Sequence, residues 1–125
     1  MVNIEENINL KAHTTFGVDS MASKFVSFSN LKELKEVFAL QPSPFLILGG
    51  GSNILLTQNY EGWVIKNNIK GIEVYKEDED YIYLKVGAGE NWHEFVQHCI
   101  SEGYGGIENL SLIPGNVGTS PMQNI

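Results

Sequence analysis

The clearest periodic pattern in the chain lies in the segment NWHEFVQHCISEG, residues 91–103. Apolar side chains recur there at the i, i+3, i+4, i+7 and i+8 spacing that places them on one face of an α-helix. These residues are Trp92, Phe95, Val96, Cys99 and Ile100. The spacing predicts a helix whose apolar face is buried, and Gly103 is suited to its C-terminal cap.

A second helix is predicted in SNLKELKEVFAL, residues 29–40. Asn30 is suited to the N-cap, and Glu33 stands three residues later, as in a capping box. Residues 41–44 end the helix, because proline donates no backbone hydrogen bond and disfavours helix in the preceding residue. The apolar stripe expected on this helix consists of Leu31, Leu34, Val37 and Phe38.

Short runs of β-branched, aromatic and aliphatic residues predict strands around these helices. The expected strands cover residues 23–29, 45–48, 53–57 and 62–67, and residues 71–89 form a hairpin with the acidic tip 77–80. The run FLIL at 45–48 has no polar position, which is typical of a strand covered on both faces. With 125 residues, these elements indicate one domain at most, with room for a hydrophobic core.

The last stretch of the chain, ENLSLIPGNVGTSPMQNI, carries no charged residue from position 109 to position 125. It is rich in Gly, Pro, Ser and Asn, which indicates a loop rather than regular structure. A long uncharged loop in a small acidic domain is more easily explained when another group covers it. The chain also stops without a helix or strand that closes this segment, so we expect it to be a fragment.

Three consecutive glycines, Gly49, Gly50 and Gly51, separate two apolar runs in PFLILGGGSNILL. The Lys-Ser/Thr pair of a nucleoside-triphosphate loop does not follow them, and Ile54 replaces the third glycine of the dinucleotide fingerprint. A strand–loop–strand remains, in which glycines adopt positive φ and successive amides form a nest for an anion. The Ser and Asn that follow can add donors. A tight turn whose glycines are sterically required is the equally weighted alternative.

The charged residues of the chain exclude several classes of ligand and partner for such a loop. The net charge is −7, so no nucleic-acid or anionic-membrane surface is expected. All eight cationic residues are lysines, which removes the bidentate phosphate clamp of arginine. No apolar stretch approaches the ~20 residues of a membrane span. Because the acidic N-terminus also differs from a secretory signal, we expect a cytoplasmic protein.

Metal and thiol chemistry are not expected. His93 and His98 lie about 140° apart around the axis of the predicted helix, whereas joint metal ligation needs a spacing of three or four residues. Cys99 is the only cysteine and lies on the apolar face, where it is expected to act as a small hydrophobe.

Four segments together resemble one family of flavoenzymes: HTTFG (13–17), LILGGGSNILL (46–56), VGAGENWHEFV (86–96) and GGIENLSLIPGNVGTSPMQNI (105–125). They are similar to the N-terminal part of the UDP-N-acetylenolpyruvoylglucosamine reductases, also called UDP-N-acetylmuramate dehydrogenases. The resemblance implies an α+β, FAD-binding fold of the vanillyl-alcohol-oxidase and p-cresol methylhydroxylase type, incomplete in this chain. Its first lobe would cover about residues 1–57, and residues 58–125 would begin the second, with FAD between them.

The resemblance also implies where FAD is held. The glycine loop would hold the diphosphate, and the terminal stretch would line the flavin and its ribityl chain. The cofactor-binding residues carried over in this way are Leu48, Gly49, Gly50, Gly51, Ser52, Asn53, Ile54, Asn109, Pro114, Gly115, Gly118, Thr119, Ser120, Gln123 and Ile125.

The implied activity belongs to the full-length protein. NADPH would give hydride to FAD, and reduced FAD would reduce UDP-N-acetylglucosamine enolpyruvate to UDP-N-acetylmuramate for peptidoglycan. The family's catalytic Arg, Ser and Glu lie beyond residue 125, so we expect no catalytic residue and no activity in this chain alone. Two alternatives stay open: a FAD-dependent oxidase of the same fold, and a non-catalytic domain with structural glycines.

Overall fold

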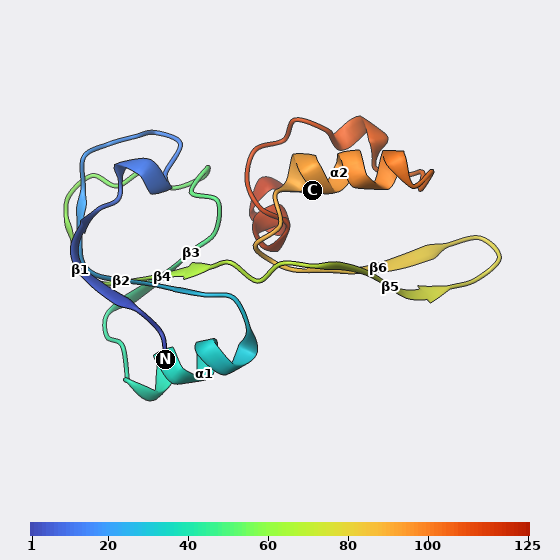
Figure 1. The fold of residues 1–125 in the computed structure, drawn as a ribbon. Helices are drawn as coiled ribbons and strands as arrows, with labels where there is room; N and C mark the ends of the chain where they lie inside the picture. The colour runs from blue at the N-terminus through green and yellow to red at the C-terminus, as the bar shows by residue number, and fades with distance from the viewer.

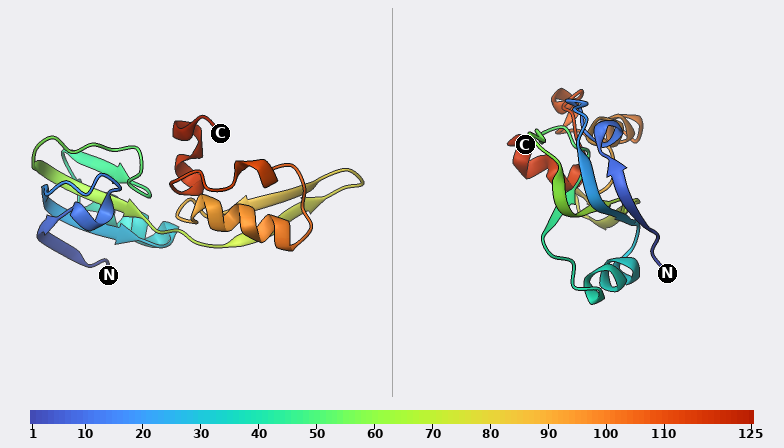
Figure 2. Two further views of the ribbon diagram at one scale, coloured as in Figure 1. Left: turned by 90° about the horizontal axis from the view of Figure 1, so that it is seen from above. Right: turned by 90° about the vertical axis from the view of Figure 1, so that its left-hand side faces the viewer.

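The computed structural model describes residues 1–125, which form one four-stranded and one two-stranded sheet. The four-stranded sheet and helix α1 lie at one end of the molecule, and the two-stranded ribbon and helix α2 lie at the other (Figures 1 and 2). The C-terminal segment returns to the region between the two ends (Figure 2). None of the helices combines the length and apolar composition that a membrane span requires.

The first sheet has the strand order β1–β2–β4–β3. Its strands are β1 (Ile4–Asn9), β2 (Met21–Phe28), β3 (Phe45–Leu48) and β4 (Tyr60–Asn67). β1 runs antiparallel to β2, whereas β2, β4 and β3 are parallel, with Ile65 opposite both Val26 and Ile47. The carboxyl ends of these three strands therefore lie at the same end of the sheet. The loops that follow this end form ligand sites in parallel sheets.

Apolar side chains are buried on both faces of this sheet, because successive residues of a strand point to opposite sides. One cluster consists of Leu10, Ala22, Phe25, Leu48 and Val64. The other consists of Val26, Phe28, Val37 and Ile65, and Val37 belongs to helix α1. The sheet is thus covered by α1 on one face and by loops on the other (Figure 1).

Helix α1 (Leu31–Ala39) begins at the predicted N-cap. Asn30 Oδ1 accepts a hydrogen bond from the Glu33 amide at 2.9 Å. The predicted apolar stripe is only partly buried, since Leu31 is 66% exposed and Phe38 is 40% exposed. Phe38 packs edge-on against Phe45 of β3 instead, with the ring centroids 5.2 Å apart.

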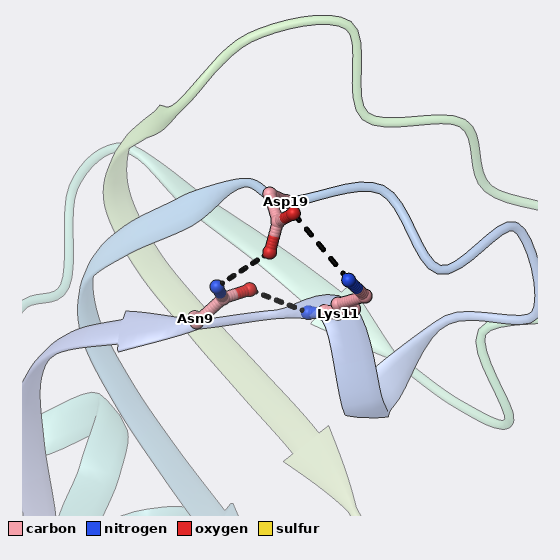
Figure 3. A network of polar contacts seen from close by, with 3 residues as sticks. All are labelled: Asn9, Lys11 and Asp19. Carbon is pink, nitrogen blue, oxygen red and sulfur yellow. Dashed lines mark hydrogen bonds and ion pairs between the residues drawn. The ribbon is translucent and has the colours of Figure 1, made fainter.

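Three polar side chains close the segment between β1 and β2 (Figure 3). The Asn9 carboxamide donates to Asp19 Oδ1 at 2.9 Å and accepts from the Lys11 amide at 2.9 Å. Lys11 Nζ lies 3.4 Å from Asp19 Oδ2. The hydrogen bond from Asn9 and the charge of Lys11 lower the pKa of Asp19. These contacts hold the ends of the connecting segment together, so its middle folds back over the sheet.

Residues 11–17 lie over the loop-covered face and reach the glycine loop. The His13 ring stacks on Phe25 with the centroids 4.6 Å apart, and Lys66 Nζ lies 3.2 Å from His13 Nδ1. The Thr15 amide donates to the Gly51 carbonyl at 3.0 Å. Gly51 has a φ of +71°, and a Cβ there would collide with the His13 carbonyl oxygen. Only glycine satisfies both conditions.

The second sheet is the predicted hairpin, in which β5 (Ile72–Glu77) pairs antiparallel with β6 (Ile82–Val86). Helix α2 (Trp92–Ser101) follows, and the Asn91 side chain caps it by accepting from the Glu94 amide at 3.0 Å. Trp92, Val96 and Cys99 are buried, as the periodicity predicts. Ile100 is 46% exposed. It lies about 80° around the axis from Trp92, at the margin of the buried face.

The terminal stretch forms two short 3₁₀-helices, η2 (Glu108–Leu110) and η3 (Val117–Gln123), where the sequence predicts only a loop. Gly118 and Pro121 lie inside η3 and do not prevent it, because a 3₁₀ turn needs few hydrogen bonds. Irregular backbone links the two helices, since Leu112 and Gly115 have φ values of +65° and +107°.

One predicted strand is absent, and the strand predicted at residues 45–48 is present but less covered than expected. Residues 53–57 form no strand, because the parallel neighbour β4 requires the chain to cross back over the sheet. Ile54 and Leu56 pack on the core during this crossing. Strand β3 is not covered on both faces, because it lies at the sheet edge, where Phe45 and Ile47 are 46% and 44% exposed.

The first sheet continues past the predicted lobe boundary near residue 57. Strand β4 lies beyond it, yet pairs with both β2 and β3. The first sheet therefore extends to Asn67, since hydrogen bonding on both sides makes β4 a central strand of that sheet. Strand β1, which the pattern of apolar residues does not predict, completes the sheet on the other side.

We expect Leu10→Ala to lower the free energy of unfolding by about 2–5 kcal/mol, because Leu10 is 1% exposed and its loss leaves a cavity. Leu31→Ala is the matched control, since that side chain is largely exposed, and its effect should stay within about 0.5 kcal/mol. Urea unfolding followed by tryptophan fluorescence measures both. Equal losses in the two variants would contradict the assigned core.

We expect stability to fall as the pH drops below the ordinary pKa of His13, 6.5. Burial, and then the charge of Lys66, lower the pKa of His13 in the folded chain. The unfolded chain therefore binds more protons in this range, so the stabilisation is complete above pH 6.5 and is lost toward acid. His13→Phe keeps an aromatic ring on Phe25 but does not titrate. Urea unfolding at pH 7.5 and 5.5 should show a smaller pH effect in this variant than in the original chain.

We expect Gly51→Ala to destabilise the fold more than Gly17→Ala. Both glycines have positive φ, at +71° and +61°, so each alanine carries a backbone cost of about 1–2 kcal/mol. Only Gly51 also faces the His13 carbonyl, which adds ~1–3 kcal/mol of overpacking, whereas Gly17 has nothing within 4 Å. Thermal unfolding compares the two variants, and equal midpoints would refute the close contact.

Candidate functional site

The glycine loop, residues 49–53, directly follows the carboxyl end of β3. Only Gly51 of its three glycines has positive φ, so the predicted conformation is wrong for Gly49 and Gly50. A neighbouring segment explains these two glycines. A Cβ on Gly49 would lie 2.6 Å from Thr119 Cγ2, and one on Gly50 would lie 3.0 Å from Asn116 Oδ1. The loop is thus pressed against the start of η3.

The backbone amides of this loop are not used by the fold. No N–H group from residue 49 to residue 53 donates a hydrogen bond to a protein carbonyl or side chain. Backbone amides in folded proteins are almost always paired with protein or water. A run of donors that face no protein acceptor can receive the oxygen atoms of an anion.

A cavity of about 400 Å³ opens beside these amides, between β3 with the glycine loop on one side and η3 on the other. Its lining consists of Leu46, Ile47, Leu48, Gly49, Gly51, Ser52, Asn53, Ile54, Thr119, Met122 and Gln123. Gln123 Nε2 donates to Ser52 Oγ at 3.1 Å and so joins the two walls. Residues 71 positions apart in the sequence therefore meet at one site.

The cavity has no titratable side chain in its lining. Its polar groups are two hydroxyls and two carboxamides, from Ser52, Thr119, Asn53 and Gln123, together with main-chain amides. A general acid or base must be a titratable group within hydrogen-bond reach of the reacting proton. This arrangement can bind and orient a ligand, and it holds no group suited to proton transfer.

Other side chains that could react or bind a metal ion lie away from this cavity. Cys99 lines a separate cavity of about 400 Å³ between β6 and α2, and burial raises the pKa of its thiol. A raised pKa keeps the thiol protonated and unreactive, in agreement with the predicted role as a small hydrophobe. The structure has no group of three or more His, Cys, Asp or Glu residues that could hold a metal ion.

The structure brings together most of the residues expected to bind the cofactor. Gly50 and Gly115 lie directly against each other, since a Cβ on Gly50 would be 3.1 Å from the Gly115 Cα. The expected residues outside the cavity lining are Gly50, Asn109, Pro114, Gly115, Gly118, Ser120 and Ile125. Three lining residues were missed in the sequence, Leu46, Ile47 and Met122. The sequence marks Leu46 and Ile47 only as apolar residues before the glycines, and Met122 only as an apolar residue in the uncharged stretch.

Residues 88–93 fix the position of the terminal stretch. The hydrogen bonds that join the two segments include Gly118 N to Ala88 O (2.9 Å), Val117 N to Glu90 O (2.8 Å), Trp92 N to Gly115 O (3.0 Å) and Trp92 Nε1 to Leu110 O (2.8 Å). Gly118 is also in close contact, because a Cβ there would lie 2.6 Å from the Ala88 Cβ. The start of α2 and the loop before it therefore carry η3 to the glycine loop.

Comparison with known proteins agrees with this geometry. Residues 23–125 match the model of a family described as FAD binding domain. The chain is 45% identical over 125 residues to the UDP-N-acetylenolpyruvoylglucosamine reductase of Flavobacterium johnsoniae, a match that covers 99% of the chain and 37% of the relative. The enzyme of the same name from Escherichia coli is 48% identical over 122 residues, covering 95% of the chain and 35% of the relative.

A solved structure also matches the fold. The crystal structure of UDP-N-acetylenolpyruvylglucosamine reductase from Thermus caldophilus superimposes with a TM-score of 0.70 at 30% identity, covering 94% of the chain and 41% of that structure. The chain thus spans little more than a third of the length of its curated relatives.

These similarities confirm the resemblance found in the four sequence segments and the expected α+β FAD-binding fold. The family model covers more than half of the chain, including both the glycine loop and the terminal stretch. It also confirms FAD as the cofactor expected from the sequence. The chain belongs to the FAD binding domain family.

Proposed function

We propose that the glycine loop holds the diphosphate of FAD and that the cofactor occupies the cavity between this loop and η3. The observation that carries the proposal is the run of amides beside that cavity, from residue 49 to residue 53, that donate to no protein group. Their dipoles are fixed by the fold, so they can stabilise phosphate oxygens without ordering long side chains. The apolar lining from β3 and Met122 suits an aromatic ring system.

The terminal stretch would then contact FAD unevenly. Thr119 and Gln123 line the cavity and would face the flavin or its ribityl chain. Gly118 packs on Ala88 and would act indirectly, by allowing η3 to approach. This division supports direct binding by the first pair and a positioning role for the glycine.

Purely structural glycines remain the competing explanation of the loop. The contacts of Gly49 and Gly50 with Thr119 and Asn116 account for the absence of side chains at both positions. They do not account for a series of amides without protein partners beside a cavity. The family match adds independent support for cofactor binding.

We further propose that the whole protein is a UDP-N-acetylenolpyruvoylglucosamine reductase, as the names of the relatives suggest. It would act in the cytoplasm, in peptidoglycan synthesis. When bound, FAD supplies hydride transfer from NADPH to the enolpyruvyl group of UDP-N-acetylglucosamine enolpyruvate. The residues described here would bind and orient the cofactor, because none of the side chains around the cavity titrates. Proton transfer to the substrate would therefore depend on residues outside this cavity.

FAD is expected to bind the chain saturably, with a change in flavin fluorescence and a rise in the midpoint of thermal unfolding, since a ligand of the folded state stabilises it by mass action. ADP, which carries the diphosphate, should compete with FAD. Riboflavin lacks the diphosphate and should compete much less. Unchanged fluorescence and an unchanged midpoint, or riboflavin binding as tightly as FAD, would contradict diphosphate recognition by the loop.

Gly50→Ala should weaken FAD binding about tenfold, because its Cβ forces Asn116 and Gly115 away from the loop. Gly105→Ala is the matched control, since nothing lies within 4 Å of a Cβ there and the φ is ordinary. The dissociation constant for FAD, measured by fluorescence titration, compares the two variants. The same affinity in both would show that the contact between the two loops does not shape the site.

A further inference from the structure

Leu112 has a backbone conformation that its side chain does not explain. Its φ is +65°, in the left-handed region that a branched side chain rarely adopts. The residue is 79% exposed, so packing of its side chain does not compensate for the strain. Such strain persists only where surrounding contacts hold the backbone in place, and it is frequent at ligand-binding segments. Another group must therefore hold Leu112.

His93 of α2 provides that contact. Its Nδ1 accepts a hydrogen bond from the Leu112 amide at 3.1 Å and lies 2.8 Å from Ser111 Oγ. Gln97 Nε2 donates to the same hydroxyl at 3.1 Å, which leaves the Ser111 proton to point toward His93. Two donors converge on Nδ1, so this nitrogen carries the lone pair and the ring proton lies on Nε2.

Leu112 lies where the path of the terminal stretch toward the glycine loop is set, so the contact with His93 affects that path. Trp92 anchors the chain on both sides of it, at the carbonyls of Leu110 and Gly115. Between these anchors, the left-handed turn at Leu112 sets the direction in which the chain leaves η2. The next residues lead to Gly115, which lies against Gly50 of the glycine loop.

We propose that His93 is a positioning residue for the cofactor site: its unprotonated Nδ1 holds Leu112 in the left-handed conformation and so directs η3 onto the glycine loop. The part of this inference that concerns FAD rests on the function proposed above. The part that concerns the backbone does not. Two sets of measurements therefore keep them separate.

Amide hydrogen exchange at Leu112, measured by NMR without FAD, tests the backbone part. His93→Ala removes the acceptor and should accelerate exchange at Leu112 about tenfold. The exchange at Val117, whose amide bonds to Glu90, should change little, because the Trp92 and Glu90 bonds remain. His93→Asn places a carboxamide oxygen near the position of Nδ1 and should restore most of the protection. Unchanged exchange in His93→Ala would overturn the proposal.

The affinity for FAD tests the positioning role. His93→Ala should weaken binding about tenfold, and His93→Asn should bind within a factor of about three of the original chain. Adding Leu112→Gly to His93→Ala should recover the affinity, because glycine adopts positive φ without support. Adding Leu112→Ala in its place is the control and should not recover it. Equal recovery by both, or none by glycine, would overturn the positioning role.

Failure of the original chain to bind FAD would refute the proposed function, but it would not refute the contact between His93 and Leu112. In that case the hydrogen-exchange results still decide whether His93 holds Leu112. The ring proton provides an independent readout, since the nitrogen chemical shifts of His93 should be those of the tautomer protonated at Nε2. A shift pattern with the proton on Nδ1 would overturn the proposal with or without FAD.

Discussion

The close approach of η3 to the glycine loop is the constraint on which the site depends. Thr119 and Asn116 occupy the space that side chains at positions 49 and 50 would need. The loop belongs to the four-stranded sheet, whereas residues 88–93 of the other end of the molecule hold η3. This contact therefore joins the two ends of the molecule (Figure 2). The cavity lies between the loop and η3.

The electrostatics of the site follow from the same contact. The chain has a net charge of −7, yet no charged side chain lines the cavity. Several of its lysines and carboxylates are paired elsewhere, as in Lys70 with Glu90 and Lys85 with Glu73. An anion there would meet only uncharged dipoles, those of the main-chain amides and of the polar side chains, whose effect is stronger where walls exclude water. A cofactor with a diphosphate and a large apolar ring fits this combination.

Features of the fold that depend on neighbouring residues in the sequence could be predicted well. Features that depend on which strands and helices pack together could not. Asn30 caps helix α1 as predicted, because a cap involves residues only three positions apart. Residues 53–57 have the composition of a strand but cross the sheet instead, because β4 pairs parallel to β3. The exposure of Phe45 and Ile47 depends on β3 being an edge strand, and composition carries no information about that.

The sequence by itself determined the helices, the hairpin, the place of the glycine loop, the absence of charge in the terminal stretch and the family resemblance. These depend on spacings of a few residues or on the order of motifs. The tertiary structure alone decided that Gly51, rather than Gly49 or Gly50, needs positive φ, and that His93 meets Leu112. Such contacts join distant residues, as Ser52 and Gln123 do, and their distances are set by how the two sheets and η3 pack.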